Sequence, residues 1–461
     1  MKPIFLQRLA PLAGAVWLAG CSMMPAYERP PAPVPVAFPF ASATAGPAAA
    51  ELEWQAFFPD PRLKQLIATA LRNNRDLRVA VLNIEQARAQ YDIRNADRLP
   101  TVGASVSGSR APASVGGTNS SYTAGLAFTA WEIDFFGRIA SLSESALAQY
   151  LGTEEGRKAV QISLVAAVAN TWLSLVADEE LLALTRQTLA TREESLRLTR
   201  LRFENGAASE LDSRQAQSLF ESARVALAQQ QRARAIDVNA LALLLGEPVP
   251  QDLAVPATTE SLSLADLPAG TPSEVLVRRP DVRQAEQQLI AANANIGAAR
   301  AAFFPRISLT AGIGSASSEL SGLFKGGSWG FTVAPQLLLP IFDSGRNAAG
   351  LRSANVSRDI ALAQYEKAIQ SAFREVADAL AGRATLGDQS QAQANVVEAE
   401  SARFRLSELR YNNGVSSYLD LLDAQRSLFA ARQALIQTRL AQLQNQVLLY
   451  RALGGGWTDR P

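Results

Sequence analysis

The sequence predicts a membrane protein of the α+β class, made of two copies of a helix–strand–strand–helix unit. Three observations support this prediction: the chain contains an internal duplication, each copy carries two segments of alternating residues, and seven-residue apolar repeats follow each pair of segments. Seven-residue spacing indicates helices that pack along a seam, and two-residue spacing indicates strands with two different faces. Each copy therefore changes period in the same order.

The duplication is visible at positions that keep a constant offset. Asp76 and Pro100 recur 205 residues later as Asp281 and Pro305. Beyond them the offset becomes 208 and holds through these pairs: Gly137-Arg138 with Gly345-Arg346, Gly206 with Gly414, Leu211-Asp212 with Leu419-Asp420, Ala216-Gln217 with Ala424-Gln425, and Leu245-Gly246 with Leu453-Gly454. Because chance does not keep such anchors in register, both halves should fold as the same unit.

Two pairs of strands are predicted, at about residues 100–131 and about residues 305–340. Their apolar residues alternate with small or polar ones, and loops rich in Gly and Ser separate the members of each pair. Strands of about ten residues with one apolar face are typical of membrane β-barrels. Four strands cannot close a barrel in lipid, because open edges would leave backbone groups unpaired in hydrocarbon. We therefore expect the chain to oligomerise.

Long helices are predicted after each strand pair. Apolar residues recur every seven positions at Leu175, Leu182, Leu189, Leu196 and Phe203, and again at Leu422, Phe429, Ile436, Leu443 and Tyr450. A helix from about Glu154 to Phe203 would be roughly 75 Å long, and the segment from about Asn347 to Tyr411 is longer. Each should end at an Asn-Gly turn, where glycine can adopt a left-handed cap. The sequence thus predicts one helical hairpin per half.

Composition argues against catalysis and against nucleic-acid binding. The 461 residues carry a formal net charge of +1, so no charge excess attracts nucleic acid. Histidine is absent and there is one cysteine, which excludes His-dependent nucleophiles and nearly all transition-metal sites. Because no nucleophile–base set or phosphate loop appears either, we predict no catalytic residues, no metal site and no cofactor.

The N-terminus reads as an export signal followed by a lipidation site. Lys2 and Arg8 form a charged region, and an apolar stretch of 12 residues from Leu9 to Gly20 follows it. The stretch ends in Leu-Ala-Gly-Cys, which is similar to the lipobox of bacterial lipoproteins, so the only cysteine, Cys21, is predicted to carry the lipid. Ser22 follows where an aspartate commonly retains lipoproteins at the inner membrane. We therefore expect a lipid-anchored protein of the outer membrane.

The predicted organisation has six segments. Residues 24–50 are rich in Pro and Ala, which favours an extended tether rather than a packed element. The segments are a signal peptide (1–20), a lipidated tether (21–50), a first repeat (51–246), a connector (247–272), a second repeat (273–454) and a C-terminal tail (455–461).

The hairpin turns carry the most informative local motif. Ser209 with Asp212, and Ser417 with Asp420, have the spacing of a capping box, which predicts that both aspartates cap the helices that follow. Asp423 lies one turn beyond Asp420 on the same helix face, where capping does not need it. In a symmetric trimer this carboxylate and the nearby leucine, Leu419, would form stacked rings around an axis, which describes a constriction.

These features together resemble the TolC-like outer-membrane efflux proteins. The resemblance covers essentially the whole chain and is strongest in IGAARAAFFPR (296–306) and from Tyr411 to Phe429. It implies a homotrimer that shares one 12-stranded barrel in the outer membrane, continued by a long α-helical periplasmic tunnel. By matching position it implies that Leu419 and Asp423 form the periplasmic gate, with Asp420 beside it.

The resemblance also implies a function and partners. The leading hypothesis is a passive duct for drugs and other small amphiphiles, coupled through a periplasmic adaptor (membrane fusion protein) to an inner-membrane, proton-driven transporter of the RND type. The exposed turns at Gly206 and Gly414 are then predicted docking sites for the adaptor. Two alternatives are the outer-membrane duct of an ATP-driven type I protein secretion system and a periplasmic coiled-coil adaptor. An adaptor needs no lipid-facing strands, so the four alternating segments count against that alternative.

Overall fold

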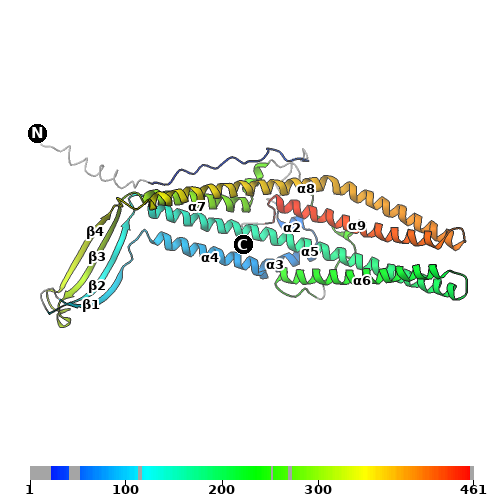
Figure 1. Ribbon diagram of the computed structural model, residues 1–461, viewed down its shortest axis with the longest axis horizontal. Coiled ribbons are helices and arrows are strands. Elements are labelled where there is room, and N and C mark those ends of the chain that lie inside the picture. Colours follow the sequence, from blue (N-terminus) through cyan, green and yellow to red (C-terminus); the bar gives the residue numbers. More distant parts are fainter. Residues whose placement is uncertain (1–21, 41–51, 113–116, 251–252, 268–272, 457–461) are drawn as a thin grey trace. The chain divides into compact units, whose positions relative to one another are not determined.

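The computed structural model describes residues 22–40, 52–112, 117–250, 253–267 and 273–456. The predicted signal peptide and the predicted lipidation site Cys21 lie outside the described residues, as does the end of the predicted tail beyond residue 456. Figure 1 labels the helices and strands along the chain.

The chain divides into two compact units, and each unit draws on both sequence repeats. The first unit contains residues 82–154 and 283–367 together with the described N-terminal residues up to Pro31. The second unit contains residues 32–81, 155–282 and the chain from 368 onward. Equivalent segments of the two repeats therefore belong to the same unit.

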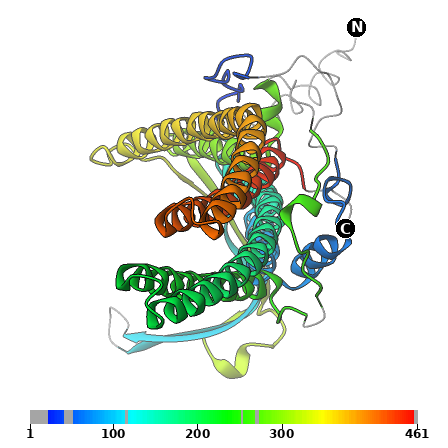
Figure 2. The same cartoon turned by 90° about the vertical axis from the view of Figure 1, so that its right-hand side faces the viewer.

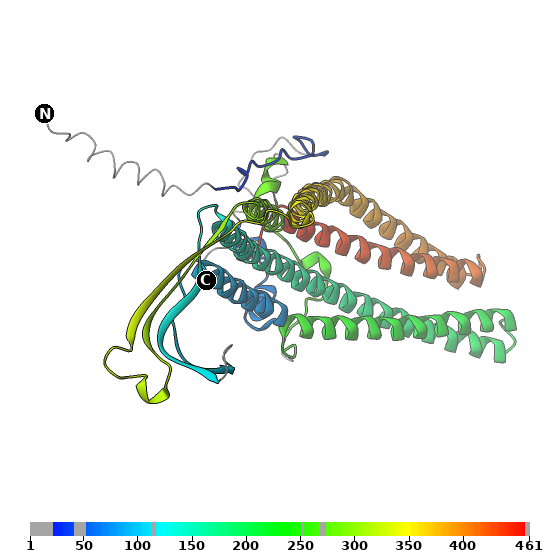
Figure 3. The ribbon, with the colours of Figure 1, turned by 60° about the vertical axis from the view of Figure 1, so that its left-hand side comes forward.

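The first unit contains a four-stranded antiparallel sheet (Figure 3). Its strands are β1 (Gly103–Pro112), β2 (Thr118–Ile133), β3 (Arg306–Ser317) and β4 (Trp329–Leu338), and they neighbour one another in that order. Each repeat supplies one antiparallel pair, and β2 pairs with β3 to join the repeats. The two predicted strand pairs are therefore present.

Both outer strands of the sheet are exposed along their whole length. Every residue of β1 and of β4 is solvent-exposed in the single chain, including Trp329 at 69% and Phe331 at 81%. An exposed strand edge leaves a row of unpaired backbone groups, and exposed aromatic rings are costly in water. The sheet of one chain is thus incomplete both at its edges and on its faces.

The strand-to-helix junction of the first repeat is built around one carboxylate. A break in the β2–β3 ladder between Phe128 and Trp131 turns the end of β2. Glu132 beyond the break lies between two arginines, with its Oε2 atom 2.7 Å from Arg138 and 2.7 Å from Arg306. These ion pairs tie the end of β2 to the start of the next helix and to β3.

Helix α5 (Arg138–Glu204) begins earlier than the sequence predicted. The prediction of a start near residue 154 was wrong, because the helix begins directly after Gly137, which has a left-handed φ of 70°. Asp134 caps the new helix by accepting a hydrogen bond from the Ala140 amide at 2.7 Å. The first turns contain buried serines instead of large apolar residues, so they show no seven-residue pattern: Ser141, Ser143 and Ser145.

The strand-to-helix junction of the second repeat also has an aspartate that caps the helix start, but its backbone conformation differs. Helix α8 (Arg346–Asn412) follows two consecutive left-handed residues, Ser344 and Gly345, with φ values of 56° and 83°. Asp343 accepts hydrogen bonds from the amides of Gly345 and Asn347 at 2.9 and 2.8 Å. The first repeat has the sequence FFGR (135–138) at this junction and the second has FDSGR (342–346), and the backbone bends differently at the two.

The second unit contains most of two helical hairpins, seen end-on in Figure 2, and the first part of each long helix belongs to the first unit. One consists of α5 and α6 (Glu210–Leu245), and the other of α8 and α9 (Tyr418–Ala452). Both α5 and α8 have 67 residues, roughly 100 Å at 1.5 Å per residue. Their first and last residues differ by 208 in number, so the duplication seen in the sequence is confirmed helix by helix.

Shorter helices and an aromatic cluster complete the second unit. Phe57 at the end of α2 (Trp54–Phe57) stacks on Tyr450 of α9, with ring centroids 4.1 Å apart, and both side chains are fully or almost fully buried. The other short elements are α3 (Pro61–Asn73), η2 (Thr259–Ser261) and η3 (Ser273–Arg278). Helices α4 (Arg75–Ala96) and α7 (Pro280–Ala301) pass through both units, and η4 (Leu320–Gly322) lies in the loop before β4.

The described N-terminal segment is extended but not free, which corrects the expectation of an unpacked tether. In the first unit Arg29 pairs with Glu286 of α7 at 2.6 Å, and Tyr27 donates a hydrogen bond to the same carboxylate at 3.0 Å. A Cβ atom on Gly297 would lie 2.8 Å from the Cα atom of Met24, so only glycine leaves room for this contact. Proline composition predicted the extended backbone but could not predict what it packs against.

One part of α5 is apolar enough, by length and composition, to cross a membrane. Its most apolar 18-residue window has a mean hydropathy of 1.6, and 56% of that window is buried inside the fold. Trp172, Leu173 and Leu175 from this helix are among the largest fully buried side chains. Helix α5 therefore supplies part of the buried core.

Candidate functional site

The two hairpin turns share one backbone geometry. Gly206 and Gly414 have φ values of 72° and 71°, the left-handed conformation that favours glycine. The amide of Ala207 donates to the Arg202 carbonyl at 2.7 Å, and the amide of Val415 donates to the Arg410 carbonyl at 2.9 Å. No atom lies within 4 Å of a Cβ built on either glycine, so backbone conformation and not crowding requires glycine there.

Both predicted capping boxes are present. In α6 the Ser209 hydroxyl accepts from the Asp212 amide, and the Asp212 carboxylate accepts in return from the Ser209 amide. Ser417 and Asp420 make the same reciprocal pair at the start of α9. Such caps stabilise a helix by about 0.5–2 kcal/mol. Asp420 therefore has a structural task in the single chain, beside its predicted place next to the gate.

Asp423 and Leu419 lie on the exposed side of α9. The Asp423 carboxylate forms an ion pair with Arg403 of α8, whose pKa this hydrogen bond raises above its usual value. Arg403 also contacts Glu400 at 3.2 Å. The side chains of Arg403 and Asp423 are 45% and 53% exposed, and Leu419 is 52% exposed. Water screens an ion pair of this kind strongly, so its contribution in one chain alone is small.

The structure brings two tyrosines to the same place, which sequence reasoning missed. Tyr418 shares a hydrogen bond with Ser195 of α5 at 2.9 Å, and Tyr411 accepts one from Arg202 at 2.8 Å. Their ring centroids lie 5.4 Å apart. The tyrosines thus tie the tip of the second hairpin to the long helix of the first. Their spacing of seven residues was the available signal, but periodicity does not identify a partner.

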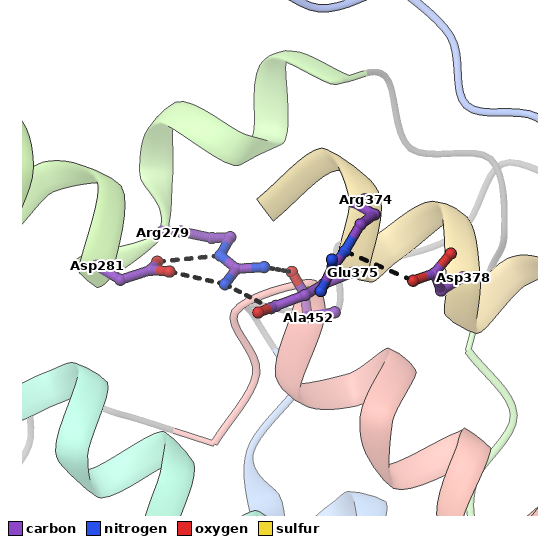
Figure 4. A network of polar contacts seen from close by, with 6 residues as sticks. All are labelled: Arg279, Asp281, Arg374, Glu375, Asp378 and Ala452. Carbon is purple, nitrogen blue, oxygen red and sulfur yellow. Dashed lines mark hydrogen bonds and ion pairs between the residues drawn. The ribbon is translucent and has the colours of Figure 1, made fainter. Parts of the chain in front are cut away.

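A second polar network lies at the other end of α9, around the buried Arg279 (Figure 4). Its guanidinium donates to Asp281 at 2.7 and 3.0 Å, to Glu375 at 2.9 Å and to the Ala452 carbonyl at 2.8 Å. Burial opposes the charge, but the two carboxylates more than offset this and raise the pKa of Arg279. Arg279 thus joins the start of α7, the middle of α8 and the end of α9.

These features agree with a known family. A family model described as "OEP: Outer membrane efflux protein" matches residues 66–247 and 271–455. The chain belongs to this family. Each matched segment contains one strand pair and one helical hairpin, so the outer membrane efflux protein model matches both repeats of the chain.

Named relatives of this efflux protein support the same conclusion. It is 51% identical over 455 residues to the "Probable efflux pump outer membrane protein TtgC" of Pseudomonas putida, covering 96% of this chain and 94% of the relative. It is 45% identical over 471 residues to the "Outer membrane protein OprJ" of Pseudomonas aeruginosa, covering 99% of this chain and 97% of the relative.

Solved structures share the fold. The open state of the MtrE outer membrane channel of Neisseria gonorrhoeae superposes with a TM-score of 0.87 at 42% identity, covering 95% of this chain and 98% of that one. A membrane protein from Pseudomonas aeruginosa gives a TM-score of 0.86 at 44% identity, covering 94% and 100%.

The predicted family and fold class are therefore confirmed. The efflux protein has the duplicated fold of the trimeric TolC-like channels, in which each chain gives four strands to an outer-membrane β-barrel and long helices to a periplasmic tunnel. It is an efflux protein of the outer membrane. The roles of the gate residues and of the two turns stay predictions.

Proposed function

We propose that this efflux protein is the outer-membrane channel of a tripartite pump and conducts drugs and other small amphiphiles passively to the exterior. An RND-type, proton-driven transporter of the inner membrane supplies the energy, and a periplasmic adaptor (membrane fusion protein) joins the two. Relatives are named for antibiotic, toluene and solvent efflux, which supports this substrate class. The observation that carries the proposal is a sheet with two open edges combined with helices of 67 residues.

Trimer formation would complete the sheet. The β1 edge of one chain pairs with the β4 edge of the next, so that three four-stranded sheets close into one barrel with no edge exposed to lipid. The exposed aromatic residues of β4 then face hydrocarbon, where burial stabilises them. The two helical hairpins of each chain then form one third of the wall of a helical tunnel in the periplasm.

A deletion strain tests the substrate class directly. The strain is screened against antibiotics, solvents, dyes and organic acids, with the wild-type gene restored on a plasmid as the control. Increased sensitivity to several small amphiphiles, reversed by the plasmid, is the expected result. Unchanged sensitivity together with loss of one secreted protein would favour the type I secretion alternative instead.

The proposal includes a lipid anchor and a domain division. Residues 1–20 are removed as a signal peptide, Cys21 receives the lipid, and the N-terminal segment to residue 50, which packs in part against α7, leads to the repeats at 51–246 and 273–454, joined by the connector at 247–272. Replacing Cys21 with alanine should abolish labelling by radioactive palmitate yet leave folded trimers, because the barrel has its own membrane affinity. Label retained by Cys21→Ala would contradict the assignment.

The proposal also places a gate and two docking tips at the hairpin turns. Leu419 and Asp423 form rings of three around the trimer axis, with the capping residue Asp420 beside them. Gly206 and Gly414 are the contact points for the adaptor. The exposure of Leu419 and Asp423 in the single chain supports the gate, since these side chains are available to an axis shared with other subunits.

A further inference from the structure

A cavity of about 250 Å³ lies within the second unit, lined by residues of α5, α8 and α9. Its apolar walls come from Leu184 on one side and from Phe404, Leu428 and Phe429 on the other. Helix α5 also supplies a buried arginine, Arg192. The cavity is far from the open sheet edges in sequence and contains none of the predicted gate or docking residues.

Arg192 is the unusual residue of this cavity. Its side chain is only 6% exposed, and its Nε–H is buried without a hydrogen-bond partner. One terminal nitrogen donates to the Leu219 carbonyl at 3.1 Å, and the guanidinium lies over the Phe429 ring, 5.2 Å from its centroid. Burial, and then repulsion from Arg426, lower the pKa of Arg192. The surroundings therefore oppose the charge instead of neutralising it.

The cavity lacks a counter-charge for this arginine. Among the described residues that line it, none carries a carboxylate, whereas Arg432 adds a second guanidinium. The amide oxygen of Gln425 is also buried there without a donor. A buried cation without a paired anion is strongly unfavourable, and unpartnered buried groups in a native protein call for an explanation. A ligand that supplies an anion would neutralise the charge of Arg192, whereas the Gln425 oxygen would need a separate donor.

We propose that this cavity binds a small carboxylate with an apolar tail, whose carboxylate pairs with the guanidinium groups of Arg192 and Arg432, the two charged side chains among the described lining residues. Planar guanidinium groups match carboxylates in geometry, which favours this anion over a spherical one. The two phenylalanine rings and the two leucines receive the tail. A volume of about 250 Å³ is below the usual range for drug-sized ligands and fits a benzoate-sized molecule.

The second repeat shows that the site is specific to one place in the molecule. The residue equivalent to Arg192, with the offset of 208, is Glu400. Glu400 has its own ionic partner, Arg403, at 3.2 Å, and that pair is partly exposed. The duplicated position thus carries the opposite charge and is satisfied within the chain. Only the copy on α5 leaves a buried guanidinium in need of an external anion.

Fluorine NMR of the purified trimer in detergent tests the proposal. The probe is 4-fluorobenzoate, and 4-fluorobenzamide is the matched neutral control of nearly the same shape. Binding to so large a particle should broaden the benzoate signal and leave the benzamide signal nearly unchanged, after subtraction of the effect of empty micelles. Arg192→Met should weaken benzoate binding by about tenfold or more, because a charged hydrogen bond is lost.

Two further variants keep the test decisive. Arg432→Met should also weaken benzoate binding. It replaces Arg192→Met as the test variant if Arg192→Met yields no trimer. Arg426→Met is the matched control, because it removes a nearby positive charge that does not line the cavity, and it should retain binding within about threefold. Benzoate should raise the melting temperature of the wild type and leave that of Arg192→Met unchanged. Equal broadening by benzoate and benzamide, or full binding by both cavity variants, would overturn the proposal.

Discussion

The two repeats make the same tertiary contact with different chemistry. In the first repeat the buried amide of Asn74 donates to the Leu244 carbonyl at 3.0 Å. In the second repeat Arg279 stands at the equivalent position and donates to the Ala452 carbonyl at 2.8 Å. The offset of 205 relates the two donors, and the offset of 208 relates the two acceptors. Both repeats thus have a side-chain donor to a carbonyl at the end of the hairpin, but the donor is neutral in the first repeat and charged in the second.

The change of charge required a new partner. Arg279 gains an ion pair with Glu375 at 2.9 Å, whereas the first repeat has Ala167 at the position equivalent to Glu375. The pattern recurs elsewhere in the hairpins, where Ser195 and Gln215 correspond to the ion pair of Arg403 and Asp423. The hairpin turns and their capping boxes are common to both repeats, and ionic groups distinguish the two hairpins.

The largest expected effect is on the two contacts at the hairpin ends. Arg279→Met removes a buried charge from two carboxylates and a carbonyl, and we expect it to lower the free energy of unfolding by about 2–4 kcal/mol. Asn74→Ala removes the donor to the Leu244 carbonyl and the acceptor of the Leu77 amide, and it should cost about 1–3 kcal/mol. Thermal unfolding of purified protein measures both. An equal or smaller loss for Arg279→Met would mean that the added charges bring no extra stability.

The next comparison concerns the tips and rests on the proposed trimer. Replacing Leu419 and Asp423 with alanine should raise single-channel conductance in planar bilayers by about twofold or more, because two rings of side chains leave the constriction. Cation preference should fall as well, since three negative charges are removed. Folding and trimer yield should stay unchanged.

The first repeat provides the matched control for the gate. Leu211 and Gln215 are equivalent to Leu419 and Asp423, and Gln215 carries no charge. Alanine at both of these positions should change conductance and cation preference much less. Unaltered conductance in the variant of the second repeat would place the constriction elsewhere, and Leu419 and Asp423 would then be purely structural.

The turns should respond equally in both repeats. A tryptophan at Gly206 or at Gly414 projects into open space, so it obstructs a docking partner without a clash inside the chain. The left-handed backbone makes each substitution cost only about 1–2 kcal/mol. We expect loss of drug resistance at normal trimer abundance, measured by minimum inhibitory concentrations and immunoblotting. Normal resistance in both variants would remove the docking assignment.

The smallest effect is expected in the middle of the first hairpin. Burial, Asp237 and Glu179 raise the pKa of Asp178 to about 6, whereas the positions equivalent to Asp178 and Asp237 hold the uncharged Leu386 and Asn445. As the pH rises above the lower pKa of the unfolded state, Asp178 loses its proton in the unfolded chain while it still keeps the proton in the folded chain. The free energy of unfolding therefore falls as the pH rises from about 4 to about 6, and it stays lower above that pH.

Replacing Asp178 with asparagine removes this penalty. Because the Asp178 side chain is only half-buried, solvent screening limits the increase in the free energy of unfolding to about 1 kcal/mol at pH 7.5. At pH 4.5 the increase should be small. Melting temperatures at the two pH values measure the difference. Asp178→Asn that stabilises equally at both pH values would show that the carboxylate is not the cause.

Sequence reasoning recovered the features that recur along the chain. The capping boxes, the strand pairs and the seam residues each follow from a short pattern with a known physical basis. It placed the start of α5 about sixteen residues too late, because small buried serines replace the apolar residues that mark a helix face. Arg192, Tyr411 and Tyr418 act through partners far away in sequence, and no local pattern specifies such partners.

The equal lengths of α5 and α8 limit how this protein can change in evolution. Each residue added to a helix rotates everything beyond it by roughly 100° and advances it by 1.5 Å. A single insertion in α5 alone would rotate Ser195 away from α9 and break its hydrogen bond with Tyr418. It would also shift the hairpin turn at Gly206 along the helix axis relative to the turn at Gly414. Insertions or deletions of seven residues, made in all four hairpin helices together, would preserve the seam. The family should therefore vary in tunnel length by whole heptads and in matched sets.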